Sequence, residues 1–124
     1  MNLLNDFYRI ESADRGQSES RYSIRLDAGH RIYAAHFPGE PITPGVCILQ
    51  IGVELLSDAV GCRLDLSVAR NVKFLSILRP DGRPVSVLVH KIALEGDSVK
   101  AQVEVSVETT LIAKMSLVCL KAAR

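Results

Sequence analysis

The chain has 124 residues, of which 48% are hydrophobic and 23% are charged, and its formal net charge is +1. This length suits a single domain with its own core, and near neutrality gives no reason to expect a nucleic acid or a membrane surface as partner. No apolar run reaches the ~18 residues of a membrane-spanning helix. The N-terminus lacks a secretory signal pattern, and three widely spaced cysteines are typical of buried thiols in a reducing compartment. We therefore expect one cytoplasmic domain, residues 1–124.

Two strands and a loop are expected first. Residues 6–16 contain a short strand that ends near Gly16. Residues 20–30 alternate apolar and polar side chains around Tyr22, as in a half-buried strand. Residues 29–45 are rich in proline and glycine, which predicts a loop.

A buried helix is expected over residues 46–60, with Gly61 as its C-terminal cap. Its apolar residues point in all directions, which is typical of a helix buried on most sides. Polar residues interrupt the run at Gln50 and Glu54, and again at positions 57 and 58. These positions share one helical face because they lie about four residues apart.

Four further strands are expected over residues 66–78, 85–94, 98–108 and 111–121. Short turns between them predict an antiparallel meander. The helix would lie against one face of this sheet, and a second copy of the chain could cover the remainder.

The loop and the start of the helix carry the motif H-F-P-G-x-P-x-x-P-G-V without a gap, over residues 36–46. This motif resembles the signature of the 3-hydroxyacyl-acyl carrier protein dehydratases of fatty acid synthesis. The segment over residues 70–87 also resembles the strand and turn that follow in that family. The resemblance implies an α+β hotdog fold, in which a curved antiparallel sheet wraps one long helix. It also implies paired subunits, here a homodimer, an acyl thioester carried by acyl carrier protein or coenzyme A, and no metal or organic cofactor.

Dehydration removes a proton from C2 and hydroxide from C3, while negative charge builds on the thioester oxygen. Main-chain N–H groups at a helix N-terminus stabilise such charge. By resemblance, Gly45 supplies that N–H and His36 is the base, a role that suits a neutral imidazole. The carbonyl of Ile42 would fix the tautomer of the imidazole, and Phe37 and Val46 complete the substrate-binding set.

The family places an Asp or Glu fourteen residues after the histidine, and this position holds Gln50. An amide can hydrogen-bond a hydroxyl group but has no acid proton to give. Glu54, one helical turn further on, could supply the proton. Alternatively, the chain is an accessory subunit that binds acyl thioesters and pairs with an active paralogue. A third possibility is another thioester reaction, such as hydrolysis.

Overall fold

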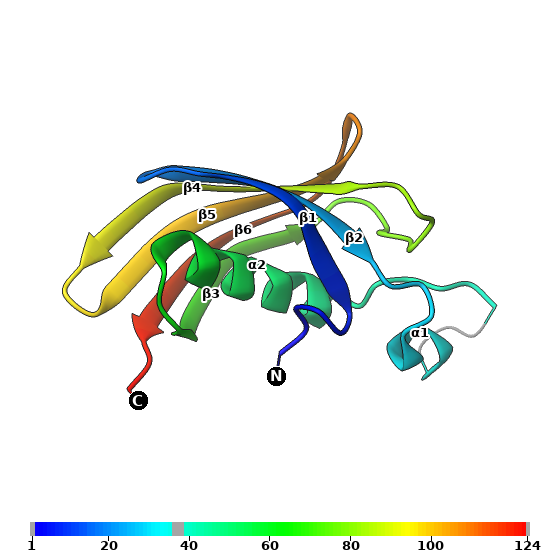
Figure 1. The fold of residues 1–124 in the computed structure, drawn as a ribbon, viewed down its shortest axis with the longest axis horizontal. Helices are drawn as coiled ribbons and strands as arrows, with labels where there is room; N and C mark the ends of the chain where they lie inside the picture. The colour runs from blue at the N-terminus through cyan, green and yellow to red at the C-terminus, as the bar shows by residue number, and fades with distance from the viewer. Residues whose placement is uncertain (1, 36–38, 124) are drawn as a thin grey trace.

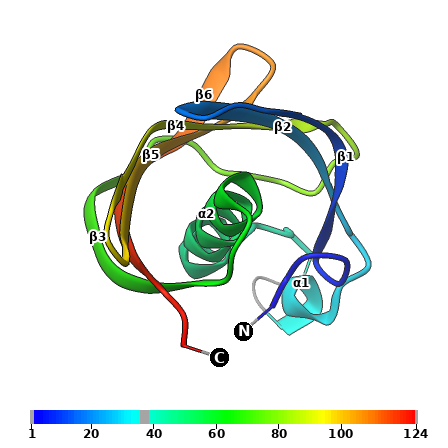
Figure 2. The same cartoon turned by 60° about the vertical axis from the view of Figure 1, so that its left-hand side comes forward.

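The computed structural model describes residues 2–35 and 39–123. Within these residues one curved sheet wraps the longer of two helices (Figures 1 and 2). In chain order the elements are β1 (Tyr8–Arg15), β2 (Glu19–Leu26), α1 (Arg31–Ala35), α2 (Gly45–Val60), β3 (Leu64–Phe74), β4 (Val85–Glu95), β5 (Ser98–Val107) and β6 (Thr110–Lys121). This arrangement is the predicted α+β hotdog fold.

The six strands pair in the order β1-β2-β4-β5-β6-β3, and every pair is antiparallel. The predicted meander of four strands is therefore wrong in one respect, because β3 pairs with β6 and not with β4. Residues 75–84 connect β3 to β4. A direct hairpin needs a much shorter turn, so this long connection lets the chain cross the molecule before β4 begins.

The predicted helix is confirmed and begins one residue earlier than expected, at Gly45. Pro44 precedes it in an extended conformation, with φ −61° and ψ 144°, where its missing N–H is not needed. Gly61 ends it with φ 77°, in the left-handed region, and donates its N–H to the carbonyl of Ser57. The predicted loop over residues 29–45 is wrong in part, because α1 forms a short helix inside it.

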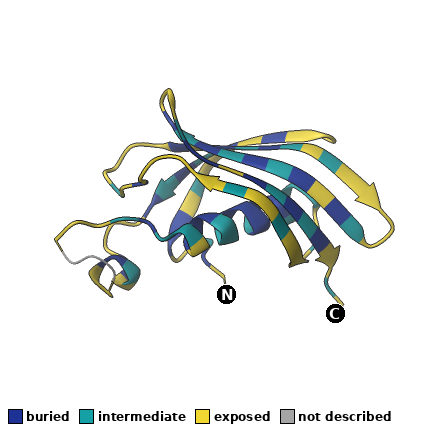
Figure 3. Cartoon of the chain, turned by 180° about the vertical axis from the view of Figure 1, so that it is seen from behind, coloured by how far each residue is buried: buried dark blue, intermediate teal, exposed yellow. Residues whose placement is uncertain are grey.

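The core lies between α2 and the concave face of the sheet. Buried and more exposed residues alternate along β2 and β5, and in β5 alternate residues from Val99 to Val107 are buried (Figure 3). At the middle of α2, an added Cβ on Gly52 would lie 3.3 Å from Met115 Sδ. The helix therefore packs directly on the sheet. Neither helix in the described part of the chain is long and apolar enough to cross a membrane.

Candidate active site

The structure describes five of the seven predicted site residues. His36 and Phe37 lie outside the described residues. Ile42 is half-buried in the segment that leads to α2, and Gly45 is the first residue of that helix. Val46 follows with 62% of its surface exposed. The roles predicted for all these residues stay predictions.

The N-terminus of α2 presents main-chain N–H groups. Cys47 and Ile48 both donate to the carbonyl of Pro44, at 3.0 and 3.2 Å. Among the described residues, the N–H groups of Gly45 and Val46 donate no hydrogen bond. Such N–H groups at the positive end of the helix dipole can stabilise a developing oxyanion.

The aromatic ring of Phe74, at the end of β3, covers Gly45. An added Cβ on Gly45 would lie 2.8 Å from Phe74 Cζ and 2.9 Å from Cε2. Phe74 itself is 50% exposed. A side chain at position 45 would therefore require the half-exposed ring of Phe74 to move.

Gln50 and Glu54 are brought together on the open face of α2. The Gln50 amide donates from Nε2 to Glu54 Oε2 at 2.9 Å. The carboxylate also accepts the N–H groups of Leu3 and Leu4, at 2.7 and 2.8 Å, and the hydroxyl of Tyr8 at 3.0 Å. Burial and the adjacent Glu54 carboxylate raise the pKa of Tyr8, so its hydroxyl stays protonated and can donate.

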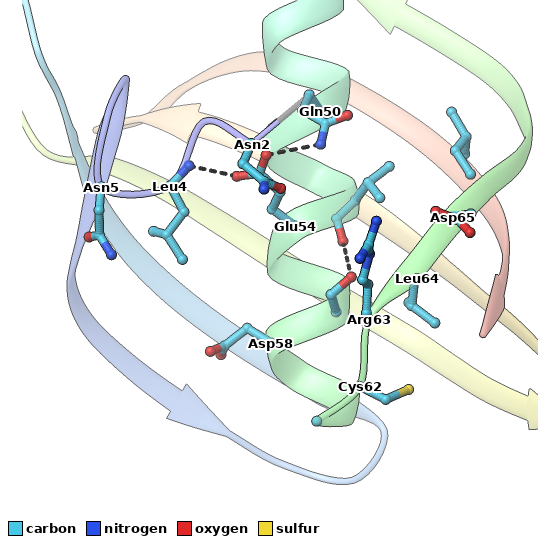
Figure 4. A pocket seen from close by; sticks show the side chains of 14 residues that line it. Asn2, Leu4, Asn5, Gln50, Glu54, Asp58, Cys62, Arg63, Leu64 and Asp65 are labelled. Atoms are coloured by element: carbon cyan, nitrogen blue, oxygen red, sulfur yellow. Dashed lines mark hydrogen bonds between the residues drawn. The ribbon is translucent and has the colours of Figure 1, made fainter. Parts of the chain in front are cut away.

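A cavity of about 800 Å³ lies beside this pair, between the N-terminal segment, α2 and the start of β3 (Figure 4). Its lining includes Asn2, Leu4, Gln50, Glu54, Arg63 and Leu66. The predicted acid position therefore faces a space that a ligand can enter. Within residues 2–35 and 39–123, no three His, Cys, Asp or Glu side chains group as metal ligands.

Tyr33 precedes the motif and Thr43 lies within it, and neither was predicted to belong to the site. Their hydroxyl groups lie 2.8 Å apart, and both residues are buried. Burial raises the pKa of Tyr33 to about 12. A tyrosine in an otherwise apolar environment needs a partner for its hydroxyl, but the sequence does not reveal which residue that partner is.

Comparison with known families decides the classification. The dehydratase family described as ApeI-like matches residues 12–114. The chain belongs to the ApeI-like dehydratase family. No curated protein sequence matches this ApeI-like chain.

Solved structures share the fold of this ApeI-like chain at low sequence identity. A chain of the dehydratase heterocomplex ApeI:P from Xenorhabdus doucetiae is 16% identical, with a TM-score of 0.77. The alignment covers 90% of this chain and 96% of the chain from the heterocomplex. An HP0420 homologue from Helicobacter felis is 10% identical, with a TM-score of 0.70 and coverage of 98% and 93%. A hypothetical thioesterase with coenzyme A from Streptococcus pneumoniae is 7% identical, with a TM-score of 0.68 and coverage of 94% and 87%. At these identities the likeness concerns the fold alone.

Proposed function

We propose that this ApeI-like protein removes water from a 3-hydroxyacyl thioester, carried by acyl carrier protein in fatty acid or related acyl-chain biosynthesis. The observation that carries the proposal is that the family match, residues 12–114, includes the unbroken motif over residues 36–46 and the start of α2. Two solved structures with the hotdog fold support a thioester substrate. One is named a dehydratase heterocomplex, and the other is named a hypothetical thioesterase with coenzyme A.

In the proposed reaction His36 takes the C2 proton, and the N–H of Gly45 stabilises the negative charge on the thioester oxygen. The C3–O bond then breaks, and the double bond forms between C2 and C3. The carbonyl of Ile42 orients the imidazole of His36. Phe37 and Val46 contact the acyl group, and the 62% exposure of Val46 is compatible with such a contact.

The leaving hydroxyl group needs one proton to depart as water. Gln50 can hydrogen-bond this group but has no acid proton. Glu54 can supply the proton only from its carboxylic acid form, and a proton on either oxygen would have to displace one of the four donors that bind there. The other proton donor among the proposed site residues is the imidazolium of His36, which already holds the proton taken from C2.

We also propose that a second hotdog subunit binds along β3. This strand is at one edge of the sheet, where its outer main-chain groups can pair with another strand. Large apolar side chains are exposed along this strand and the segment after it: Leu66, Val68, Phe74, Leu75 and Ile77. The second subunit would be a copy of this chain or a paralogue.

The second candidate function is that of an accessory subunit, which binds acyl thioesters and pairs with an active paralogue. The observation that favours it is Gln50 at the position of the family acid. The ApeI:P neighbour is named as a heterocomplex, which supports a heteromeric assembly as the setting for such a subunit.

The deciding experiment is a hydration assay with a 2-enoyl thioester, followed by the loss of its ultraviolet absorbance. We expect wild type to be active and His36→Ala to lower kcat by about 10²–10⁴-fold, as for loss of a general base. His90→Ala, on β4, is the matched control and should keep the wild-type rate. A silent wild type that gains activity with Gln50→Glu would favour the accessory function. Silence from both would contradict the dehydratase proposal.

A further inference from the structure

Glu54 accepts as many hydrogen bonds as it has strong acceptor sites. Oε2 accepts the N–H of Leu3 and the amide of Gln50, and Oε1 accepts the N–H of Leu4 and the hydroxyl of Tyr8. All four donors are neutral groups. In the described part of the chain no ion pair involves Glu54. The two oxygens of a carboxylate offer about four lone-pair sites, so the group is saturated.

The carboxylate fixes which way the amide of Gln50 points. A carboxylate only accepts hydrogen bonds, so the NH₂ group of Gln50 must face it. A reversed amide would place its own oxygen 2.9 Å from Glu54 Oε2, where two acceptors repel. The amide oxygen therefore lies on the side away from Glu54, as Figure 4 shows.

The carboxylate is itself held in place by main chain. Leu3 is 3% exposed and Tyr8 is 2% exposed, so both belong to the core. Movement of Glu54 would leave their donors without an acceptor, which costs about 1–3 kcal/mol for each buried group. The N-terminal segment, anchored by the buried Leu3, and Tyr8 therefore set the position of Glu54, and Glu54 sets the orientation of Gln50.

We propose that Glu54 is a positioning residue, which holds the Gln50 amide so that its oxygen accepts a hydrogen bond from the C3 hydroxyl of the substrate. This inference rests on the proposed function and adds a basis for specificity. A carbonyl oxygen has two lone pairs and can accept this bond beside another. The site then prefers a 3-hydroxyacyl thioester over the same thioester without the hydroxyl group, and no proton leaves Glu54.

Two readouts test this proposal. The first is the side-chain NH₂ signal of Gln50 in the ligand-free protein, measured by nuclear magnetic resonance. We expect Glu54→Gln to shift this signal, because the acceptor of the amide changes, and Asp58→Asn to leave it unchanged. The second is the binding preference for 3-hydroxybutyryl over butyryl N-acetylcysteamine thioester, which we expect to be about 5–10-fold, as one hydrogen bond provides.

Glu54→Gln should weaken this preference, and Asp58→Asn, a matched change one turn along the same helix, should keep it. An unchanged amide signal or an unchanged preference in Glu54→Gln would overturn the proposal. The binding readout needs no turnover, so a wild type that keeps the preference without hydrating an enoyl thioester contradicts only the dehydratase function. A wild type that hydrates the thioester without the preference contradicts only the role of Glu54.

A milder pair of variants applies if Glu54→Gln does not fold. Tyr8→Phe keeps the carboxylate and removes one of its donors, so we expect a smaller shift of the Gln50 amide signal. Tyr22→Phe removes the corresponding hydroxyl from Asp58 and should give no shift. Equal shifts in the two variants would overturn the coupling between Glu54 and Gln50.

Discussion

The open face of α2 carries two carboxylates one turn apart, and their surroundings differ. Each accepts a hydrogen bond from a buried tyrosine, Tyr8 at 3.0 Å for Glu54 and Tyr22 at 2.6 Å for Asp58. Glu54 completes its hydrogen bonds with two main-chain N–H groups and an amide. Asp58 instead pairs with Arg15, whose Nε and Nη2 lie 2.7 and 3.2 Å from it.

Glu54 therefore orders the groups around it, whereas Asp58 joins α2 to β1 at the surface. The side chain of Arg15 is 52% exposed and that of Asp58 is 26% exposed, so water competes for this ion pair. The guanidinium of Arg15 lowers the pKa of the Asp58 carboxyl. Glu54 has only dipolar donors, two from the main chain and two from the side chains of Tyr8 and Gln50. Both positions carry a carboxylate on the same helical face, and the partners assign a different role to each.

The largest expected effect is the loss of Glu54. Glu54→Ala removes the acceptor of two main-chain N–H groups and a buried hydroxyl. We expect the free energy of unfolding to fall by about 3 kcal/mol, because several buried donors lose their partner. Urea denaturation measures it. A loss no larger than that of Asp58→Ala would remove the distinction between the two carboxylates.

A smaller effect is expected for Asp58→Ala, which breaks a partly exposed ion pair. We expect a loss of about 1 kcal/mol at low ionic strength. The hydroxyl of Tyr22 keeps a second acceptor, the carbonyl of Leu55 at 3.3 Å. High salt screens the ion pair, so the stability difference between Asp58→Ala and wild type should shrink as ionic strength rises. The stability difference between Glu54→Ala and wild type should stay constant. Urea denaturation across a salt series separates the two cases.

The smallest effect concerns acid pH. Because Arg15 lowers the pKa of Asp58 in the folded chain, this carboxyl stabilises the fold above the ordinary pKa of ~3.9. That contribution is lost as the pH falls through the lowered pKa. Asp58→Asn should therefore be less stable than wild type near neutrality and approach it in acid. Arg15→Ala should show the same convergence, and unfolding measured over an acid pH series checks both.

Local sequence patterns predicted much of this fold. Alternation located β2, and the expected bounds of α2, with Gly61 as its cap, were right to within one residue. The pairing of β3 with β6 was missed, because strand partners distant in sequence leave no local signal. Polar residues on one face of the helix identified Gln50 and Glu54 as neighbours. Their further contacts could not be predicted, because Leu3 and Leu4 contribute only main-chain N–H groups.

The use of main-chain donors at residues 3 and 4 has a consequence for divergence within the family. Any amino acid except proline can supply the N–H that Glu54 accepts at Leu4, so this contact does not restrict which side chain evolves there. Tyr8 and Gln50 act through their side chains and are the partners expected to change together with residue 54 among relatives. Sequence covariation would thus record half of the contacts of Glu54 and overlook the half made by the N-terminal main chain.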